Sequence, residues 1–275
     1  MDIYEKITAF YTNASTEKRI IGKSLFGRNI YAVKIGEGRP VGIAQYGIHG
    51  REYITALLAV EHYKHGLFQG SFWLLPLANP DGALLCQCGL DSVSRETDRE
   101  YLLCLNDENS DFSLWKANGR GVDLNVNFAA EWGKGVKNLR VAGAENYIGE
   151  KPFSEPETLA LKDFTQEIAP NYTVSYHTKG EEIYWYFRQS GCDCVRDKNL
   201  ALVLARSTGY PLAYAKGSVG GYKDWCIQSL KIPSFTVETG SDSAVHPLTE
   251  KELPDIIEKN VNSLYDLSKE YCCKR

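Results

Sequence analysis

The pattern of a buried strand leads directly into a helical pattern at the tetrad H-G-R-E, residues 49–52. Residues 41–48 are mostly apolar, and residues 52–60 have the apolar spacing of a helix. An imidazole at the strand end and a carboxylate in the first helical turn can converge above the sheet edge, where open α/β sheets bind ligands. This pair suits zinc, which at a catalytic site takes one more protein ligand and a water. The H-x-x-E spacing alone also occurs by chance.

Two other predicted strands end in residues of matching chemistry. Residues 172–176 and 234–237 are strand-like; His177 follows the first and Glu238 the second. Three strand ends would then carry His, His and Glu, the residue types of two nitrogen ligands and a general base. Asp123 adds a carboxylate, which could orient a metal-bound imidazole. The alternative for Glu238 is an ordinary surface carboxylate at a strand end.

Taken in order, these motifs resemble the zinc carboxypeptidase family. The resemblance extends from about Ser24 to the C-terminus, and no single motif carries it. Three supporting motifs lie between or beyond the candidate ligands. The matches are H-x-x-E at 49–52, N-P-D-G at 79–82, G-V-D-L-N-x-N-F at 121–128, S-E-P-E at 154–157, His177, G-G-x-x-D-W at 220–225 and Glu238.

The resemblance implies one zinc ion and a role for each matching residue. His49, Glu52 and His177 would ligate the zinc, and Asp123 would hold His49. Glu238 would deprotonate the metal-bound water and later return the proton to the leaving amine. This is chemically consistent, because zinc lowers the pKa of bound water to about 7 and a nearby carboxylate can complete the transfer.

One departure from the family pattern concerns recognition of the substrate's terminal carboxylate. Family members carry an arginine for this purpose where this chain has Val126. A valine cannot form the bidentate, charge-assisted pair that arginine forms with a carboxylate. Lys116 and Arg120 lie where the family carries its oxyanion-stabilising arginine, and the sequence leaves open which of them takes that role.

A second departure lies at Lys223, just before the Asp-Trp pair, at a position that lines the specificity pocket in the family. A cation there favours a substrate side chain that ends in an anion, because a buried, unpaired lysine is costly. The alternative is that Lys223 points to solvent. Asn125 and Gly221, within the matching motifs, are predicted to bind substrate. Tyr214 is a candidate transition-state donor or else a core tyrosine.

Together these features resemble most the bacterial subfamily that cuts the γ-D-glutamyl-meso-diaminopimelate bond of peptidoglycan stem peptides. Its members share the patterns H-x-K-G-E, here at residues 177–181, and G-G-Y-K-D-W, here at residues 220–225. One rival prediction is a zinc carboxypeptidase that removes acidic C-terminal residues from ordinary peptides. Another is a catalytically silent protein that binds peptidoglycan peptides.

Composition restricts the protein class. The chain has 275 residues, is 43% hydrophobic and 24% charged, and has a net charge of −4. These values are typical of a globular protein and argue weakly against a nucleic-acid partner. Alternating strands and helices predict a single α/β domain over residues 1–275, with a mixed, mostly parallel sheet covered by helices on both faces. We expect no separate prodomain or wall-binding module.

The predicted location is cytoplasmic. The first residues have neither a basic leader nor an apolar run, and no segment approaches the ~20 apolar residues that span a bilayer. Reduced thiols are therefore expected for the eight cysteines, with a disulfide or bound metal at Cys192 and Cys194 as the alternative. The oligomeric state is left open.

Three expectations concern local structure. Residues 89–121 are poorly periodic and are predicted to form a long functional loop. Ser154 and Glu157 have the spacing of a capping box for a helix that ends at Ile168. Thr249 and Glu252 likewise predict the start of a last helix, which runs to about residue 271.

Overall fold

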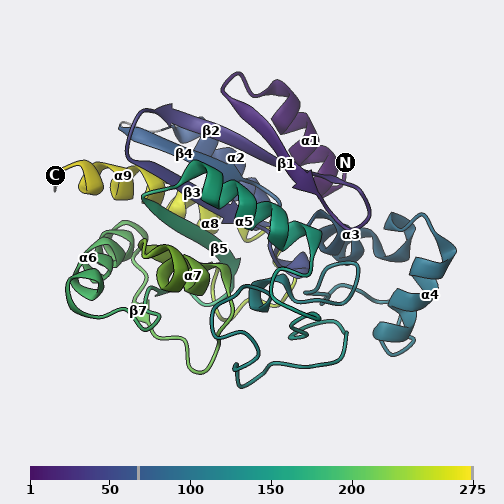
Figure 1. Ribbon diagram of the computed structural model, residues 1–275. Helices are drawn as coiled ribbons and strands as arrows, with labels where there is room; N and C mark the ends of the chain where they lie inside the picture. Colours follow the sequence, from purple (N-terminus) through teal and green to yellow (C-terminus); the bar gives the residue numbers. More distant parts are fainter. Residues whose placement is uncertain (67–68, 274–275) are drawn as a thin grey trace.

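The computed structural model describes residues 1–66 and 69–273, whose strands form one eight-stranded sheet (Figure 1). The strand order is β1-β2-β4-β3-β5-β8-β6-β7. The central strands β4, β3, β5 and β8 are parallel, whereas antiparallel pairs join β1 to β2, β2 to β4 and β6 to β8. The predicted mixed, mostly parallel sheet is therefore confirmed. The strands are β1 (Lys18–Lys23), β2 (Asn29–Glu37), β3 (Val41–Tyr46), β4 (Gly70–Leu75), β5 (Tyr172–Thr178), β6 (Glu182–Tyr184), β7 (Leu212–Ala213) and β8 (Ser234–Thr239).

Helices cover both faces of the sheet, as predicted (Figure 1). Helices α2, α6, α8 and α9 pack on one face, and α5 and α7 pack on the other. Helix α1 lies against α2 and α3. The helices are α1 (Ile3–Asn13), α2 (Thr55–His65), α3 (Pro80–Cys88), α4 (Glu96–Leu105), α5 (Pro156–Ile168), α6 (Gly191–Thr208), α7 (Tyr222–Trp225), α8 (Leu253–Asn260) and α9 (Ser263–Cys273).

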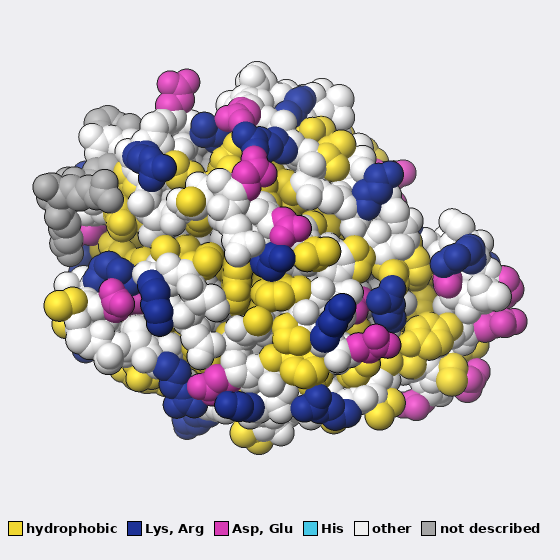
Figure 2. Space-filling model, viewed as in Figure 1, with side chains coloured by type: hydrophobic (Ala, Val, Ile, Leu, Met, Phe, Trp, Pro, Cys, Tyr) yellow, Lys and Arg dark blue, Asp and Glu magenta, His cyan; other side chains and the backbone are white. Residues whose placement is uncertain are grey.

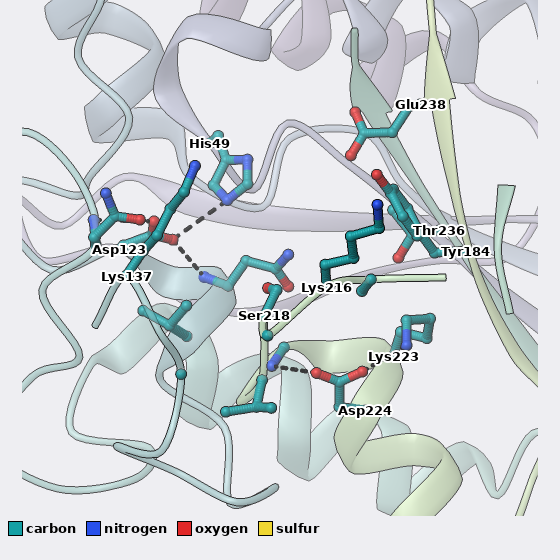
Figure 3. Close-up of a pocket in the computed structure, with 18 of the residues that line it drawn as sticks. His49, Asp123, Lys137, Tyr184, Lys216, Ser218, Lys223, Asp224, Thr236 and Glu238 are labelled. Carbon is teal, nitrogen blue, oxygen red and sulfur yellow. Dashed lines mark hydrogen bonds and ion pairs between the residues drawn. The ribbon is translucent and has the colours of Figure 1, made fainter. Parts of the chain in front are cut away.

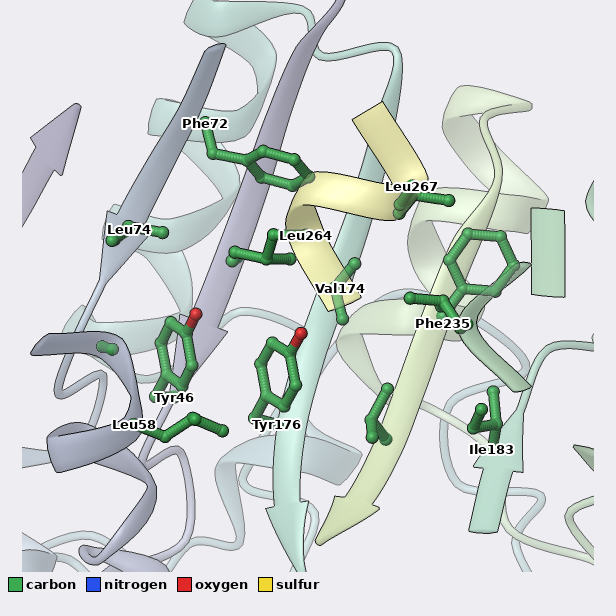
Figure 4. Close-up of a cluster of buried hydrophobic side chains, with 14 of the residues drawn as sticks. Tyr46, Leu58, Phe72, Leu74, Val174, Tyr176, Ile183, Phe235, Leu264 and Leu267 are labelled. Carbon is green, nitrogen blue, oxygen red and sulfur yellow. The ribbon is translucent and has the colours of Figure 1, made fainter. Parts of the chain in front are cut away.

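Alternation along the central strands divides the core between the two faces. Ala44 and Leu74 contribute to the cluster under α2, α8 and α9, which Figure 4 shows. Ile43 and Trp73, their neighbours in sequence, contribute to the cluster under α5 and α7. Successive side chains of a strand point to opposite faces, so a parallel sheet covered on both sides needs nearly continuous apolar strands. This explains the apolar run that precedes the H-G-R-E tetrad.

None of the three expected local structures forms in full. Residues 89–121 are not one long loop, because they contain the short 3-10 helix η2 (Gly89–Ser92) and helix α4. The last predicted helix is two helices, α8 and α9. The irregular stretch lies further on, at residues 106–155, where the 3-10 helix η3 (Leu124–Val126) is the only helix or strand among these described residues.

The predicted capping box at Ser154 does not form. Helix α5 is preceded by Glu155 as its N-cap residue, and the Ser154 hydroxyl donates to the Glu155 carboxylate at 2.7 Å. The Glu157 carboxylate instead accepts the backbone N–H of Leu25 at 2.9 Å. A long-range contact therefore replaces the local one that the spacing suggested.

Charged side chains of both signs are interleaved on the face of the molecule that Figure 2 shows. Lysine and arginine lie beside aspartate and glutamate around patches of hydrophobic side chains.

Candidate metal centre and active site

Three adjacent parallel strands bring the predicted site residues to one edge of the sheet. His49 follows β3, and the short 3-10 helix η1 (Gly50–Glu52) carries Glu52. His177 lies in β5, beside β3, and pairs in register with Glu238 in β8. The carboxyl ends of these strands meet above one edge, where open α/β sheets bind ligands.

The turn into η1 has little free space. A Cβ atom at Gly50 would lie 2.5 Å from the carbonyl oxygen of Gly82, so only glycine fits there. The Thr55 hydroxyl accepts the Gly47 N–H at 2.9 Å and donates to the Glu52 carbonyl at 2.8 Å. These contacts fix the direction in which the Glu52 side chain leaves the backbone.

The three predicted ligands converge with their donor atoms facing one another. Nδ1 of His49 lies 2.8 Å from one Glu52 oxygen, and Nδ1 of His177 lies 2.9 Å from the other. The two Nδ1 atoms are 3.2 Å apart, and all three side chains are buried. Two nitrogens at about 2.0–2.1 Å from a tetrahedral zinc are about 3.3 Å apart, so the residues fit one zinc ion.

Asp123 lies behind His49, on the side of the imidazole away from Glu52, and its role in holding His49 stays a prediction. Its Oδ1 lies 3.3 Å from Nε2 of His49, and its Oδ2 lies 3.0 Å from the Lys116 ammonium (Figure 3 shows the contact with His49). Burial alone would raise the pKa of Asp123, but Lys116 and His49 together hold it well below its usual range. An ionised Asp123 on Nε2 leaves Nδ1 free to face the metal position.

The electrostatics of Glu52 and Glu238 differ. Burial opposes ionisation of both, but the two imidazoles lower the pKa of Glu52 well below its ordinary value. Burial raises the pKa of Glu238 to about 7, partly offset by His177 and reinforced by the charge of Glu52. A carboxyl group with a pKa near neutrality can both accept a proton and return it.

A cavity of about 850 Å³ opens beside these residues (Figure 3). Eight of the residues named from the sequence line it, as does Val126. They are His49, Lys116, Asp123, Asn125, Tyr214, Gly221, Lys223 and Glu238.

The two candidate cations of the segment before Asp123 have different positions. Lys116 is largely buried and lines the cavity. Arg120 is not among the lining residues; it is about half exposed, and its guanidinium lies 3.6 Å from Glu155. Of the pair that the sequence left open, Lys116 is the one that lines the cavity, and its catalytic role stays a prediction.

Tyr214 is at the rim of the cavity, where its ring packs against Trp185 and Tyr186 with centroids 5.7 Å apart in each case. It is 58% exposed, so the alternative of a core tyrosine is wrong. Its role as a transition-state donor stays a prediction.

Lys223 is buried, so the alternative that it points to solvent is wrong. Its ammonium lies 2.5 Å from Asp224 and 3.3 Å from the carbonyl oxygen of Tyr186. Lys223 is therefore not an unpaired cation: it forms a buried ion pair with Asp224 on the cavity wall. Gly221 donates its N–H to Asp224 at 3.3 Å, which fixes the carboxylate of that pair.

Asn125 supports the cavity wall through the backbone. Its side-chain oxygen accepts the N–H of Tyr222 at 3.1 Å, and a Cβ atom at Gly221 would lie 3.1 Å from that oxygen. The geometry therefore gives Asn125 and Gly221 a close structural contact. Their roles in substrate binding stay predictions.

Sequence reasoning assigned no role to the other lining residues, among them Thr236, Arg51, Lys137 and Lys216. Thr236 could have been found, because it lies two positions before Glu238 and therefore on the same face of β8. Arg51 lies within the H-G-R-E tetrad. Lys137 and Lys216 lie in irregular segments, where no periodicity indicates direction.

The described cysteines Cys86, Cys88, Cys104, Cys192, Cys194 and Cys226 are not joined by disulfides. The side chains of Cys272 and Cys273 lie outside the described part of the chain.

This chain belongs to the zinc carboxypeptidase family, whose model matches residues 3–263. It is 32% identical over 249 residues to gamma-D-glutamyl-L-diamino acid endopeptidase 1 of Lysinibacillus sphaericus, covering 84% of this chain and 62% of that protein. It is also 32% identical over 164 residues to murein peptide amidase A of Escherichia coli K12, covering 55% and 62%. The chain thus spans less than two thirds of the length of either curated relative.

Solved structures share the fold. Bovine thrombin-activatable fibrinolysis inhibitor, solved with a tick carboxypeptidase inhibitor, superimposes with a TM-score of 0.79 at 20% identity, covering 100% of this chain and 98% of that one. Murein-tripeptide amidase of Escherichia coli O157 gives 0.62 at 24% identity, covering 95% of both chains. Within the described residues, none of the helices is both long and apolar enough to cross a membrane.

Proposed function

We propose that this protein is a zinc-dependent peptidase that hydrolyses the γ-D-glutamyl-meso-diaminopimelate bond of peptidoglycan stem peptides. The observation that carries the substrate assignment is the buried ion pair of Lys223 and Asp224 on the cavity wall. The names of the two curated relatives support the same substrate class.

The ion pair suits diaminopimelate better than glutamate. The diaminopimelate side chain ends in a carbon that carries both an ammonium and a carboxylate. Lys223 can pair with that carboxylate and Asp224 with that ammonium, so both buried charges keep a partner when substrate enters. A glutamate side chain would offer only a carboxylate. Asp224 would then have a weaker ion pair with Lys223 and would gain no other cation.

His49, Glu52 and His177 would hold the zinc, which when bound supplies a Lewis acid and lowers the pKa of a water. Glu238 would accept a proton from the attacking water and deliver it to the leaving amine. Asp123 keeps the imidazole of His49 oriented. Lys116 supplies positive charge on the cavity wall, where the negative charge of the scissile carbonyl oxygen develops.

Three peptides that differ only in the residue after γ-D-glutamate test the assignment. The purified zinc enzyme is assayed on L-Ala-γ-D-Glu followed by meso-diaminopimelate, by lysine or by glutamate. We expect turnover of the diaminopimelate peptide well above the other two, since only it satisfies both buried charges. Replacing Lys223 by methionine should remove that preference while zinc content stays constant.

Two alternative functions give different outcomes in the same assay. Faster turnover of an ordinary peptide with a C-terminal glutamate would favour an acid-specific carboxypeptidase. Binding of the diaminopimelate peptide without any turnover by the zinc-loaded protein would favour a silent binding protein.

A further inference from the structure

Five cationic side chains line the cavity in the described part of the chain, and three of them have acidic partners. Lys116 pairs with Asp123 at 3.0 Å, and Lys223 pairs with Asp224 at 2.5 Å. The third, Arg51, lies 3.7 Å from Glu145. The cations of the inner cavity are therefore already neutralised by the protein.

The other two cations, Lys137 and Lys216, have no carboxylate within ion-pair distance among the described residues. Both are exposed at the cavity rim and come from irregular segments far apart in sequence. The segments touch through the Val136 N–H, which donates to the Gly217 carbonyl at 2.9 Å. A Cβ atom at Gly217 would lie 2.5 Å from the Val136 side chain, so the contact is close.

The two free lysines face different parts of the cavity (Figure 3). Lys216 points toward the wall where Glu238, Thr236 and Tyr184 lie, whereas Lys137 lies on the side of Asp123. Lys216 is thus the unpaired cation on the side of the proposed proton donor.

The chemistry of the proposed reaction defines which substrate group comes near Lys216. Glu238 delivers a proton to the leaving amine. In a stem peptide that ends at diaminopimelate, the carbon bearing that amine also bears a free carboxylate. This group therefore lies within a few ångströms of Glu238, and Val126 offers it no charge.

We propose that Lys216 binds the carboxylate on the carbon that carries the released amine. The inference rests on the proposed function and sharpens it, because it assigns the preferred substrate as a stem peptide that ends at diaminopimelate. Where a further residue follows diaminopimelate, the carboxylate has become an amide and the ion pair is lost. Lys216 thus makes the enzyme prefer peptides that end at diaminopimelate over peptides that continue beyond it.

An acid and amide pair of substrates isolates this contact. The tripeptide L-Ala-γ-D-Glu-meso-diaminopimelate is compared with its analogue amidated at that one carboxyl group. The wild-type enzyme should prefer the acid by roughly tenfold in kcat/KM, the scale of a charged hydrogen bond. Lys216→Ala should abolish the preference by slowing the acid alone, and Lys216→Arg should keep it.

Lys137→Ala is the matched control, since it removes the other free cation of the same rim. It should leave the ratio between acid and amide at the wild-type value. If Lys216→Ala slows both substrates equally, or leaves the ratio unchanged, the proposed contact is overturned. Zinc content and thermal unfolding of each variant show whether a loss comes from misfolding.

The design separates failure of this inference from failure of the proposed function. If the enzyme cuts only ordinary peptides with C-terminal glutamate, the same acid and amide comparison is made on that peptide. If it cuts neither, calorimetric binding of the tripeptide acid and its amide to wild-type and Lys216→Ala protein gives the readout. Equal binding of both by wild type, or no binding of either, overturns the role of Lys216.

Discussion

Two groups of carboxylates are buried in this protein, and their surroundings differ. Glu52 and Asp123 lie among imidazoles and an ammonium at the metal centre, and their pKa values are well below the ordinary range. Asp81, Glu155 and Glu157 form the second group, near the start of α5. There, burial and the charge of Asp81 raise the pKa of Glu157 to about 8.

The neighbours of the second group explain its role. Arg28 pairs with Asp81 at 2.7 Å, and the Asn118 amide donates to Glu155 at 2.8 Å and to Glu157 at 3.2 Å. Glu157 itself has amide partners but no cation. This group joins the turn between β1 and β2, helices α3 and α5, and the segment before Asp123, and it has a structural role.

The comparison shows that burial of an acid does not by itself mark a site. Burial disfavours the charged form of Glu52, Asp123 and Glu157, and positive neighbours outweigh that effect at Glu52 and Asp123 but not at Glu157. Convergence of three donor side chains, from the turn after β3 and from β5, distinguishes the metal centre. The predictions below test that difference, from the largest expected effect to the smallest.

Removal of a metal ligand should have the largest effect. We expect His177→Ala to lose its zinc during dialysis and to lose turnover with it, because two protein ligands remain where a catalytic zinc takes three. Elemental analysis measures the zinc. His62→Ala is the control: His62 is buried against Tyr46 and the Asn260 carbonyl, so its loss should cost stability but not zinc. Full zinc in His177→Ala would contradict the ligand assignment.

Loss of the proposed base comes next. Glu238→Gln keeps the shape of the side chain and removes its proton affinity, so kcat/KM should fall by roughly 10²–10⁴ with zinc content unchanged. Glu182, which pairs with Glu238 in register between β6 and β8, also lines the cavity and provides the control. Glu182→Gln should change turnover only slightly. Turnover that survives in Glu238→Gln would exclude Glu238 as the base.

A smaller effect is expected from the carboxylate behind His49. Asp123→Asn should weaken zinc affinity by about 10–100-fold, because the imidazole loses its anionic partner and Lys116 loses its ion pair. Competition with a chelator measures the affinity. Glu145→Gln, which removes the acid beside Arg51 on the same cavity, should leave it unchanged. Equal affinities in the two variants would mean that Asp123 does not support the ligand.

The parts of the molecule that were predicted from sequence are those fixed by repeating or local patterns. The apolar run before residue 49 located β3, and the ends of two further predicted strands placed His177 and Glu238 at the same edge. The capping box at Ser154 does not form because the Glu157 carboxylate accepts a hydrogen bond from the backbone N–H of Leu25, which is distant in sequence. The exposed lysines of the rim, Lys137 and Lys216, carry no sequence pattern, since tertiary contacts between irregular segments set their direction.

The structural group of carboxylates should affect stability alone. A pKa of about 8 for Glu157 in the folded protein, against an ordinary 4.5, means that folding favours its protonated form. This contribution to the free energy of unfolding is complete below about pH 4.5 and is lost as pH rises toward 8, on the order of 5 kcal/mol in total.

Glu157→Gln cannot ionise, so its stability should fall less than that of wild type between pH 5 and pH 8. Denaturant unfolding at both values measures the difference, and Glu150→Gln, at an exposed position, should behave as wild type. Parallel pH dependence in wild type and Glu157→Gln would show that Glu157 is ionised in the fold, and the contrast between the two groups would then disappear.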